Sequence, residues 1–282
     1  MARSYLQVLG EIGNIQEDIP QLRWNRYHHA VFTGELVPGC RVCMRRALSC
    51  IHIGLRCNLD CTFCPLESRV RHYSPEEDAQ VRAEAWEGFL AQSAQGRVEG
   101  VSFTGGEPLL YLDELEAYAQ RVLERLPEAH LWLYTNGLLA SKEVLQRVRA
   151  SGIQEIRLNL AATGFSKQGL RTLALAREIF AYVVVEIPTY PPQAKLLLES
   201  LEELAAIGID QLNMQELVIT PANIHRVVGE VYSIGEVNLL YGSRLLTYKV
   251  IRRCLERDYP FTCVDCSAGI KYLLDHATLL GF

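Results

Sequence analysis

The sequence has no long apolar run and no excess of positive charge. No stretch approaches the roughly 18 apolar residues that span a bilayer, so a membrane protein is not expected. The first residues lack the apolar core of a secretory signal peptide, which favours a cytoplasmic protein. A formal net charge of −5 provides no extended basic surface, so nucleic-acid binding is not favoured.

Two common catalytic signatures are also absent. No G-x-S-x-G nucleophile elbow occurs, so a serine hydrolase is not supported. No G-x-x-x-x-G-K-[ST] loop occurs, so a phosphate cradle of that type is not supported either. What remains is an ordinary globular composition, with 49% hydrophobic and 22% charged residues. The 282 residues suffice for one large domain or two small ones.

Short apolar segments recur along the chain and indicate strands. They lie at residues 49–53, 100–103, 130–134, 155–160, 182–187 and 211–217. Helical periodicity fills the spaces between them, at residues 76–93, 112–126, 141–150, 167–180 and 195–206. Ser141 and Ser166 are predicted N-caps, and Gly152 and Gly208 are predicted helix ends. This alternation predicts an α/β fold with a parallel sheet, either doubly wound or a partial barrel.

Polar residues stand at the predicted carboxyl ends of these strands, where active sites of such folds gather. They are Gly105, Gly106 and Glu107 after the second strand, Asn136 after the third, Arg157 and Asn159 on one face of the fourth, and Glu186 near the end of the fifth. Side chains alternate along a strand, so residues two apart share a face. We expect these groups to converge on one rim.

Three of the nine cysteines lie on one short loop that follows the first strand. Cys57, Cys61 and Cys64 have the spacing C-x3-C-x2-C. Three thiolates hold three irons of a cubic [4Fe–4S] cluster and leave the fourth iron open for chemistry. Zinc is the rival metal, but a tetrahedral zinc site requires a fourth ligand. In a cytoplasmic protein these cysteines are ligands or reduced thiols and not a disulfide framework.

This loop, with Phe63 before its last cysteine, resembles the signature of the radical SAM enzymes. The segment Gly105-Gly106-Glu107 resembles the GGE segment of that superfamily. The resemblance extends over residues 48–220, and the activating enzymes of glycyl-radical proteins are nearest in size and style. It favours a partial (β/α)6 TIM-like barrel, with N- and C-terminal extensions at residues 1–47 and 221–282.

The resemblance also implies a reaction and a cofactor. In the family, S-adenosylmethionine chelates the open iron, and the reduced cluster cleaves it to a 5′-deoxyadenosyl radical that abstracts a substrate hydrogen. The GGE segment meets the methionine amino group, and the residue at the position of Phe63 packs near the adenine. Asn136, Asn159 and Glu186 are candidates for holding the ribose and the methionine carboxylate. Arg157 either contacts that carboxylate or pairs with an acidic side chain.

The other cysteines form a second group. Cys40 and Cys43 make one CxxC pair and Cys263 and Cys266 make another, which together predict a four-thiolate metal site. Such a site accepts zinc, a single iron or an Fe–S cluster, and the resemblance favours an auxiliary [4Fe–4S] cluster. The site would join the two extensions. Cys50 and Cys254 are left over and would replace or supplement these ligands.

The substrate is a peptide, a protein or a small molecule, and the resemblance to activating enzymes favours a peptide or protein. A reductase or a flavodoxin-type protein would supply the electron. One alternative is an iron–sulfur electron carrier or a metal-stabilised binding scaffold, in which the cluster ignores S-adenosylmethionine. Another is an RNA-modifying radical SAM enzyme, against which the acidic charge balance argues.

Overall fold

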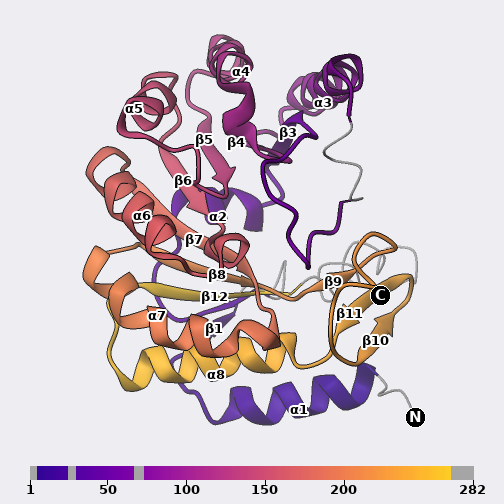
Figure 1. Ribbon diagram of the computed structural model, residues 1–282, viewed down its shortest axis with the longest axis vertical. Helices are drawn as coiled ribbons and strands as arrows, with labels where there is room; N and C mark the ends of the chain where they lie inside the picture. Colours follow the sequence, from indigo (N-terminus) through magenta and orange to yellow (C-terminus); the bar gives the residue numbers. More distant parts are fainter. Residues whose placement is uncertain (1–4, 25–29, 67–72, 268–282) are drawn as a thin grey trace. The chain divides into compact units, whose positions relative to one another are not determined.

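The computed structural model describes residues 5–24, 30–66 and 73–267 (Figure 1). The chain divides into two compact units. The first, here called the β3–β7 unit, comprises Leu36–Asp60 and Ser68–Val185. The second, here called the β8–β12 unit, comprises Met1–Glu35, Cys61–Glu67 and Glu186–Phe282.

The β3–β7 unit is built on a row of parallel strands. They are β3 (Leu48–Gly54), β4 (Gly100–Gly105), β5 (His130–Thr135), β6 (Glu155–Leu158) and β7 (Tyr182–Pro188), hydrogen-bonded in this order. The boundary between the units falls within β7, after Val185. Within the described residues β3 has β4 as its one strand neighbour, so this row does not close into a barrel.

Helices connect these strands and lie beside them (Figure 1). They are α3 (Pro75–Ala94), α4 (Leu112–Arg125), α5 (Lys142–Ala150) and α6 (Lys167–Ile179), while α2 (Pro38–Met44) precedes β3. The hydroxyls of Ser141 and Ser166 accept the backbone N–H groups of Val144 and Gly169, which confirms both predicted N-caps. Ser74 forms a full capping box with Glu77 at the start of α3.

Apolar side chains at alternate strand positions and at three- and four-residue helix steps form the core of this unit. Leu131 and Leu133 of β5 are fully buried, and so are Leu115, Ala119 and Val122 on one face of α4. Each such side chain removed from water stabilises the fold by about 1.5–3 kcal/mol when it is as large as leucine. The strands are therefore held with their carboxyl ends side by side.

The β8–β12 unit contains the later strands and three helices. Strand β8 (Gln211–Gln215) pairs in parallel with β12 (Thr262–Cys266), and β12 pairs antiparallel with β2 (Val31–Phe32), which pairs with β1 (Arg23–Trp24). A separate small sheet contains β9 (Val218–Ile219), β10 (Val231–Ile234) and β11 (Val237–Leu240). The helices are α1 (Tyr5–Glu17), α7 (Ala194–Ile207) and α8 (Ser243–Glu256), and α8 contacts both α1 and β12.

All six strands and five helices predicted from periodicity are present. The fourth strand ends at Leu158 instead of residue 160, because Leu160–Thr163 turns into a 3-10 helix, η3. The last predicted strand ends at Gln215. Periodicity did not predict α1, α2, α8 or β12. Among the described residues, no helix combines the length and apolarity that crossing a membrane requires. The division into residues 1–47, 48–220 and 221–282 stays a prediction.

Candidate functional site

The segment after β4 is hydrogen-bonded to the start of the cysteine loop. The backbone N–H of Gly106 donates to the carbonyl of Gly54 at 2.9 Å. The backbone N–H of Glu107 donates to the carbonyl of Arg56 at 2.9 Å. The two motifs that the sequence singled out separately are thus joined through their backbones in the β3–β7 unit.

Glycine is required at both positions of this junction. Gly105 has φ +144°, and a Cβ there would lie 2.1 Å from the carbonyl oxygen of Gly54. A Cβ on Gly106 would lie 2.2 Å from the carbonyl oxygen of Arg56. A pair of glycines permits backbone close to a neighbouring group and positive φ angles. In the structure they allow the close approach of the two loops.

Glu107 is fully buried and its carboxylate joins β4 to β5. Its Oε1 accepts the hydroxyl of Thr135 at 2.7 Å and the backbone N–H of Leu109 at 3.0 Å. Its Oε2 accepts the backbone N–H of Asn136 at 2.7 Å. Burial raises the pKa of Glu107, and these hydrogen bonds offset the rise only in part. The carboxylate therefore positions its own loop.

Asn136 reaches the cysteine loop from the end of β5. Its amide Nδ2 donates to Oδ1 of Asn58 at 2.7 Å and lies 3.9 Å from Sγ of Cys57. Its Oδ1 accepts the backbone N–H of Leu138 at 3.0 Å. Asn58 did not stand out in the sequence, because nothing in a single asparagine indicates such a distant partner.

Asn159 lies at the end of β6, next to β5. Its backbone N–H donates to the carbonyl of Thr135 at 2.9 Å. Its side-chain Oδ1 accepts the backbone N–H of Ala162 at 3.1 Å and caps η3. The carboxyl ends of β3, β4, β5 and β6 are thus linked to one another by direct hydrogen bonds.

Arg157 pairs with an acidic side chain, which is one of the two roles considered for it. Its Nε donates to Oε1 of the buried Glu155 at 2.7 Å, and one terminal nitrogen donates to Sγ of Cys40 at 3.5 Å. Burial by itself would raise the pKa of Glu155, but Arg157, His130 and the backbone N–H of Gly39 outweigh it and lower that pKa. This ion pair anchors α2 against β6.

Glu186 lies in the β8–β12 unit and is nearly buried, at 7% exposure. Its Oε2 accepts Nδ2 of Asn213 at 2.9 Å, and its Oε1 accepts Nε2 of Gln215 at 2.6 Å. Two amides from β8 therefore satisfy part of the hydrogen-bonding capacity of this carboxylate and fix its orientation.

Phe63 is buried in the same unit. Its ring meets that of Tyr190 edge to face, with centroids 6.2 Å apart. Its carbonyl accepts Nδ2 of Asn223 at 3.1 Å. Asn223 is fully buried, and no motif in the sequence indicates this contact.

The three loop cysteines are partly exposed and not in disulfides. The boundary between the units falls inside their loop, between Asp60 and Cys61. Sγ of Cys57 accepts the backbone N–H of Leu59 at 3.5 Å, and the N–H of Cys64 donates to the carbonyl of Cys61 at 3.1 Å. Accessible thiols with an N–H donor to sulfur suit an iron–sulfur ligand set.

In the second group of cysteines, one of the two CxxC pairs lies on a strand. Cys263 and Cys266 are three residues apart on β12, so their side chains point to opposite faces of the strand. The thiol of Cys263 is hydrogen-bonded to that of Cys254 on α8, and this contact, together with burial, raises the pKa of Cys263. Cys40 lies on α2 beside Arg157. The CxxC pair of β12 therefore does not form a chelate on one face.

Across residues 5–24, 30–66 and 73–267, no group of three cysteine, histidine, aspartate or glutamate side chains is placed to hold a metal ion. This statement includes both predicted cysteine sites. The donor chemistry fits the cluster expected at Cys57, Cys61 and Cys64. The auxiliary metal site stays a prediction.

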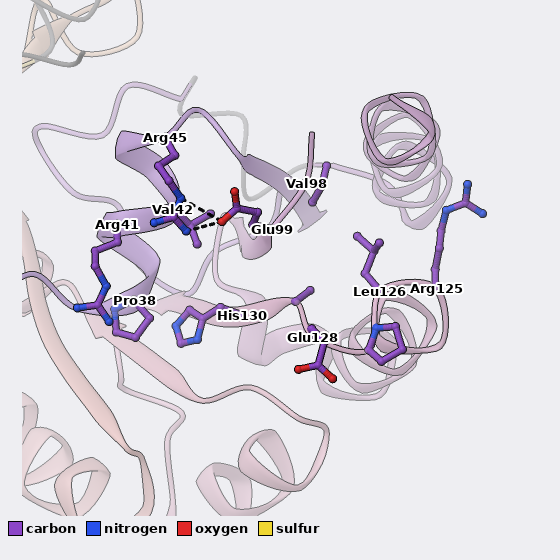
Figure 2. A pocket seen from close by; sticks show the side chains of 12 residues that line it. Pro38, Arg41, Val42, Arg45, Val98, Glu99, Arg125, Leu126, Glu128 and His130 are labelled. Carbon is purple, nitrogen blue, oxygen red and sulfur yellow. Dashed lines mark hydrogen bonds and ion pairs between the residues drawn. The ribbon is translucent and has the colours of Figure 1, made fainter. Parts of the chain in front are cut away.

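A pocket of about 640 Å³ opens at the other end of the strands of the β3–β7 unit (Figure 2). Glu99 precedes β4 and His130 begins β5, so the pocket lies at the amino-terminal ends. Figure 2 shows Arg45, the residue after α2, directed at Glu99, with its Nε 3.0 Å from Oε2 of Glu99. Active sites of parallel α/β folds lie at the opposite ends, so this pocket is separate from the candidate site.

Two curated proteins resemble this chain in sequence. A Methanocaldococcus jannaschii protein, provisionally named a glycyl-radical enzyme activating enzyme, is 26% identical over 231 residues, which cover 77% of this chain and 60% of that protein. The PqqA peptide cyclase of Granulibacter bethesdensis is 29% identical over 106 residues, which cover 37% of this chain and 26% of that protein. The chain thus spans less than two thirds of the length of these relatives.

Solved structures share the fold at low sequence identity. Streptococcus suis SuiB bound to the precursor peptide SuiA superposes with a TM-score of 0.57 at 17% identity, covering 85% of this chain and 54% of SuiB. Methylornithine synthase (PylB) gives a TM-score of 0.51 at 16% identity, covering 75% of this chain and 64% of that one. The predicted α/β fold with a parallel sheet is confirmed. The model of the Radical SAM superfamily matches residues 51–214, more than half of the sequence, and this chain therefore belongs to that superfamily.

Proposed function

We propose that this chain is a radical SAM enzyme that binds a [4Fe–4S] cluster through Cys57, Cys61 and Cys64. The observation that carries the proposal is the backbone junction of the two family motifs, in which Gly106 and Glu107 donate to the carbonyls of Gly54 and Arg56. When bound and reduced, the cluster supplies the electron that cleaves S-adenosylmethionine to a 5′-deoxyadenosyl radical for hydrogen abstraction.

The residues of the chain bind and orient the cofactors. Three thiolates would hold three irons, and the loop of Gly105, Gly106 and Glu107 would present backbone groups to the methionine amino group. Asn136, Asn159 and Glu186 are the candidates for the ribose and the methionine carboxylate, and Phe63 for packing near the adenine. Asn213 and Gln215 hold the Glu186 carboxylate in one orientation and so reduce the reorganisation that ligand binding requires.

The proposed substrate is a peptide or a protein. The names of the two curated relatives support this choice, since one refers to activation of a glycyl-radical enzyme and the other to a peptide cyclase. A small-molecule substrate remains the second candidate. We place the enzyme in the cytoplasm, with a reductase or flavodoxin-type protein as electron donor. The proposal keeps the auxiliary Cys-ligated site predicted from Cys40, Cys43, Cys263 and Cys266.

The decisive experiment is anaerobic reconstitution followed by dithionite reduction and an assay for 5′-deoxyadenosine. We expect cleavage of S-adenosylmethionine by the reconstituted protein and none by a Cys57→Ala, Cys61→Ala, Cys64→Ala variant. A fully loaded cluster without cleavage would overturn the proposal. The EPR spectrum of the reduced cluster separates the electron-carrier alternative, because only a cluster with an open iron changes its signal on addition of S-adenosylmethionine.

A further inference from the structure

The four residues that lead into Cys57 are held by side chains and backbone groups from other elements. The carbonyls of Ile53, Gly54 and Arg56 accept, respectively, the Arg82 guanidinium at 2.8 Å, the Gly106 N–H at 2.9 Å and the Glu107 N–H at 2.9 Å. The N–H groups of Leu55 and Arg56 donate to Oδ1 of Asp78 at 2.8 Å and to the hydroxyl of Tyr111 at 3.0 Å. Ile53 and Gly54 end β3, and Leu55 and Arg56 begin the loop. Contacts from α3 and from the segment after β4 therefore hold the chain just before Cys57.

Asp78 is the centre of this arrangement. It lies in the first turns of α3, is 1% exposed and has no role in the predicted site. Its Oδ2 accepts Nε of Arg56 at 2.9 Å and the hydroxyl of Tyr111 at 2.7 Å. Burying a carboxylate is costly unless it is paired and hydrogen-bonded, and the three donors to Asp78 offset that cost while their positions become fixed.

Tyr111 completes the arrangement from the 3-10 helix η2 (Pro108–Tyr111). Its hydroxyl also accepts Nε of Arg56 at 3.1 Å, and the Arg56 guanidinium lies 5.0 Å from its ring centroid. A Cβ on Gly54 would lie 2.2 Å from the ring, so glycine is required for the ring to pack against the strand end. Tyr111 is almost fully buried.

The charges of Arg56 and Asp78 also bear on the cluster expected at the cysteine loop. Arg56 immediately precedes Cys57, and its side chain is 43% exposed, whereas its partner Asp78 is buried. The reduction potential of an iron–sulfur cluster depends on nearby net charge and hydrogen bonding. A cation beside a cluster raises its potential, and a carboxylate paired with that cation lowers it again.

We propose that Asp78 is a positioning residue for the cysteine loop: with Tyr111 it fixes the Leu55 and Arg56 backbone, and it balances the charge of Arg56 beside the first cysteine ligand. The part that concerns the cluster rests on the proposed function. The fixing of the loop is a property of the chain alone.

The loop-fixing part is tested on the apo protein by hydrogen exchange of the backbone amides of Leu55 and Arg56. Asp78→Asn and Tyr111→Phe are expected to speed exchange there by about tenfold, the effect of losing about 1.4 kcal/mol of local stability. Asp113→Asn is the matched control, because it removes an exposed carboxylate that pairs with Arg147 in the same unit. Unchanged protection in both variants would overturn this part.

The charge-balancing part is tested by the midpoint potential of the reconstituted cluster, followed by EPR. Asp78→Asn is expected to raise the potential and Arg56→Met to lower it, with Asp113→Asn unchanged. A merely structural role predicts no such opposite signs, so shifts in the same direction would contradict the proposal. If Asp78→Asn does not fold, Tyr111→Phe is used for the exchange measurement and Arg56→Met for the potential. If the wild type takes up no cluster, the proposed function fails while the exchange experiment still decides the loop.

Discussion

Two buried carboxylates, those of Glu107 and Glu155, accept hydrogen bonds from different kinds of donor. Glu107 accepts three hydrogen bonds from groups at the ends of β4 and β5. Glu155 pairs with Arg157 and His130 and accepts the N–H of Gly39. The pKa of Glu107 is raised because burial outweighs its neutral donors, whereas the pKa of Glu155 is lowered because a guanidinium faces it.

Glu107→Gln is expected to destabilise the apo protein by about 1–3 kcal/mol, because an amide N–H₂ would then face a backbone or hydroxyl donor. Urea unfolding followed by circular dichroism measures this change. Glu124→Gln on the exposed side of α4 is the control, and we expect less than about 0.5 kcal/mol from it. Equal stability of the two variants would mean that the three hydrogen bonds of Glu107 contribute nothing.

Glu155 is expected to make the protein sensitive to acid. Its pKa is lowered on folding, so its stabilising contribution is present above the ordinary glutamate pKa of about 4.3 and is lost as pH falls through the lower folded value. Glu155→Gln should therefore show a flatter dependence of unfolding free energy on pH below about pH 4 than the wild type. Parallel curves for the two proteins would contradict the ionised pair.

At the scale of elements, strand periodicity decides which cysteines can meet. Residues of β12 alternate between two faces, so Cys263 is directed at Cys254 of α8 while Cys266 is on the opposite face. The pairing of β12 with β8 sets Cys266 opposite Gln215, which binds Glu186. A CxxC spacing in a turn brings its thiols together, whereas the same spacing on a strand separates them.

Alkylation of the native apo protein is expected to modify Cys254 and Cys263 last among the nine cysteines. Both are buried, and the raised pKa of Cys263 leaves little of the reactive thiolate. Time-resolved labelling with iodoacetamide and peptide mass spectrometry measures the order, with the partly exposed Cys64 as internal reference. Modification of Cys263 at the rate of Cys64 would rule out this packing of β12 on α8.

At the scale of the whole molecule, the chain consists of two compact units, and two of their boundaries fall inside segments that carry candidate site residues. One boundary lies in the cysteine loop and another lies in β7, between Val185 and Glu186. The candidate cofactor residues Asn136 and Asn159 belong to the β3–β7 unit, and Glu186 and Phe63 belong to the β8–β12 unit.

The metal content of the reconstituted chain decides how many cysteine sites are loaded. About four irons per chain indicate one [4Fe–4S] cluster, about eight indicate two, and about four with one zinc indicate a structural zinc site. The triple variant Cys57→Ala, Cys61→Ala, Cys64→Ala should lose about four irons. The double variant Cys40→Ala, Cys43→Ala should lose only the second metal. Asp113→Asn, which changes an exposed carboxylate outside both cysteine groups, is the control. Full metal content without Cys40 and Cys43 would exclude them as ligands.

The sequence by itself determined the alternation of strands and helices, the helix starts at Ser141 and Ser166, and the cysteine loop with its GGE partner. These features are local, because periodicity, capping and ligand spacing act over a few residues. Only the tertiary structure decided that Arg157 pairs with Glu155 and that Glu107 accepts its hydrogen bonds from neighbouring loops. It also decided that Cys263 contacts Cys254 and that Asp78 holds the segment before Cys57. Glu107 and Asp78 find their partners in other elements. Arg157 and Glu155 are only two residues apart, but the packing of α2 and β5 around them buries the pair.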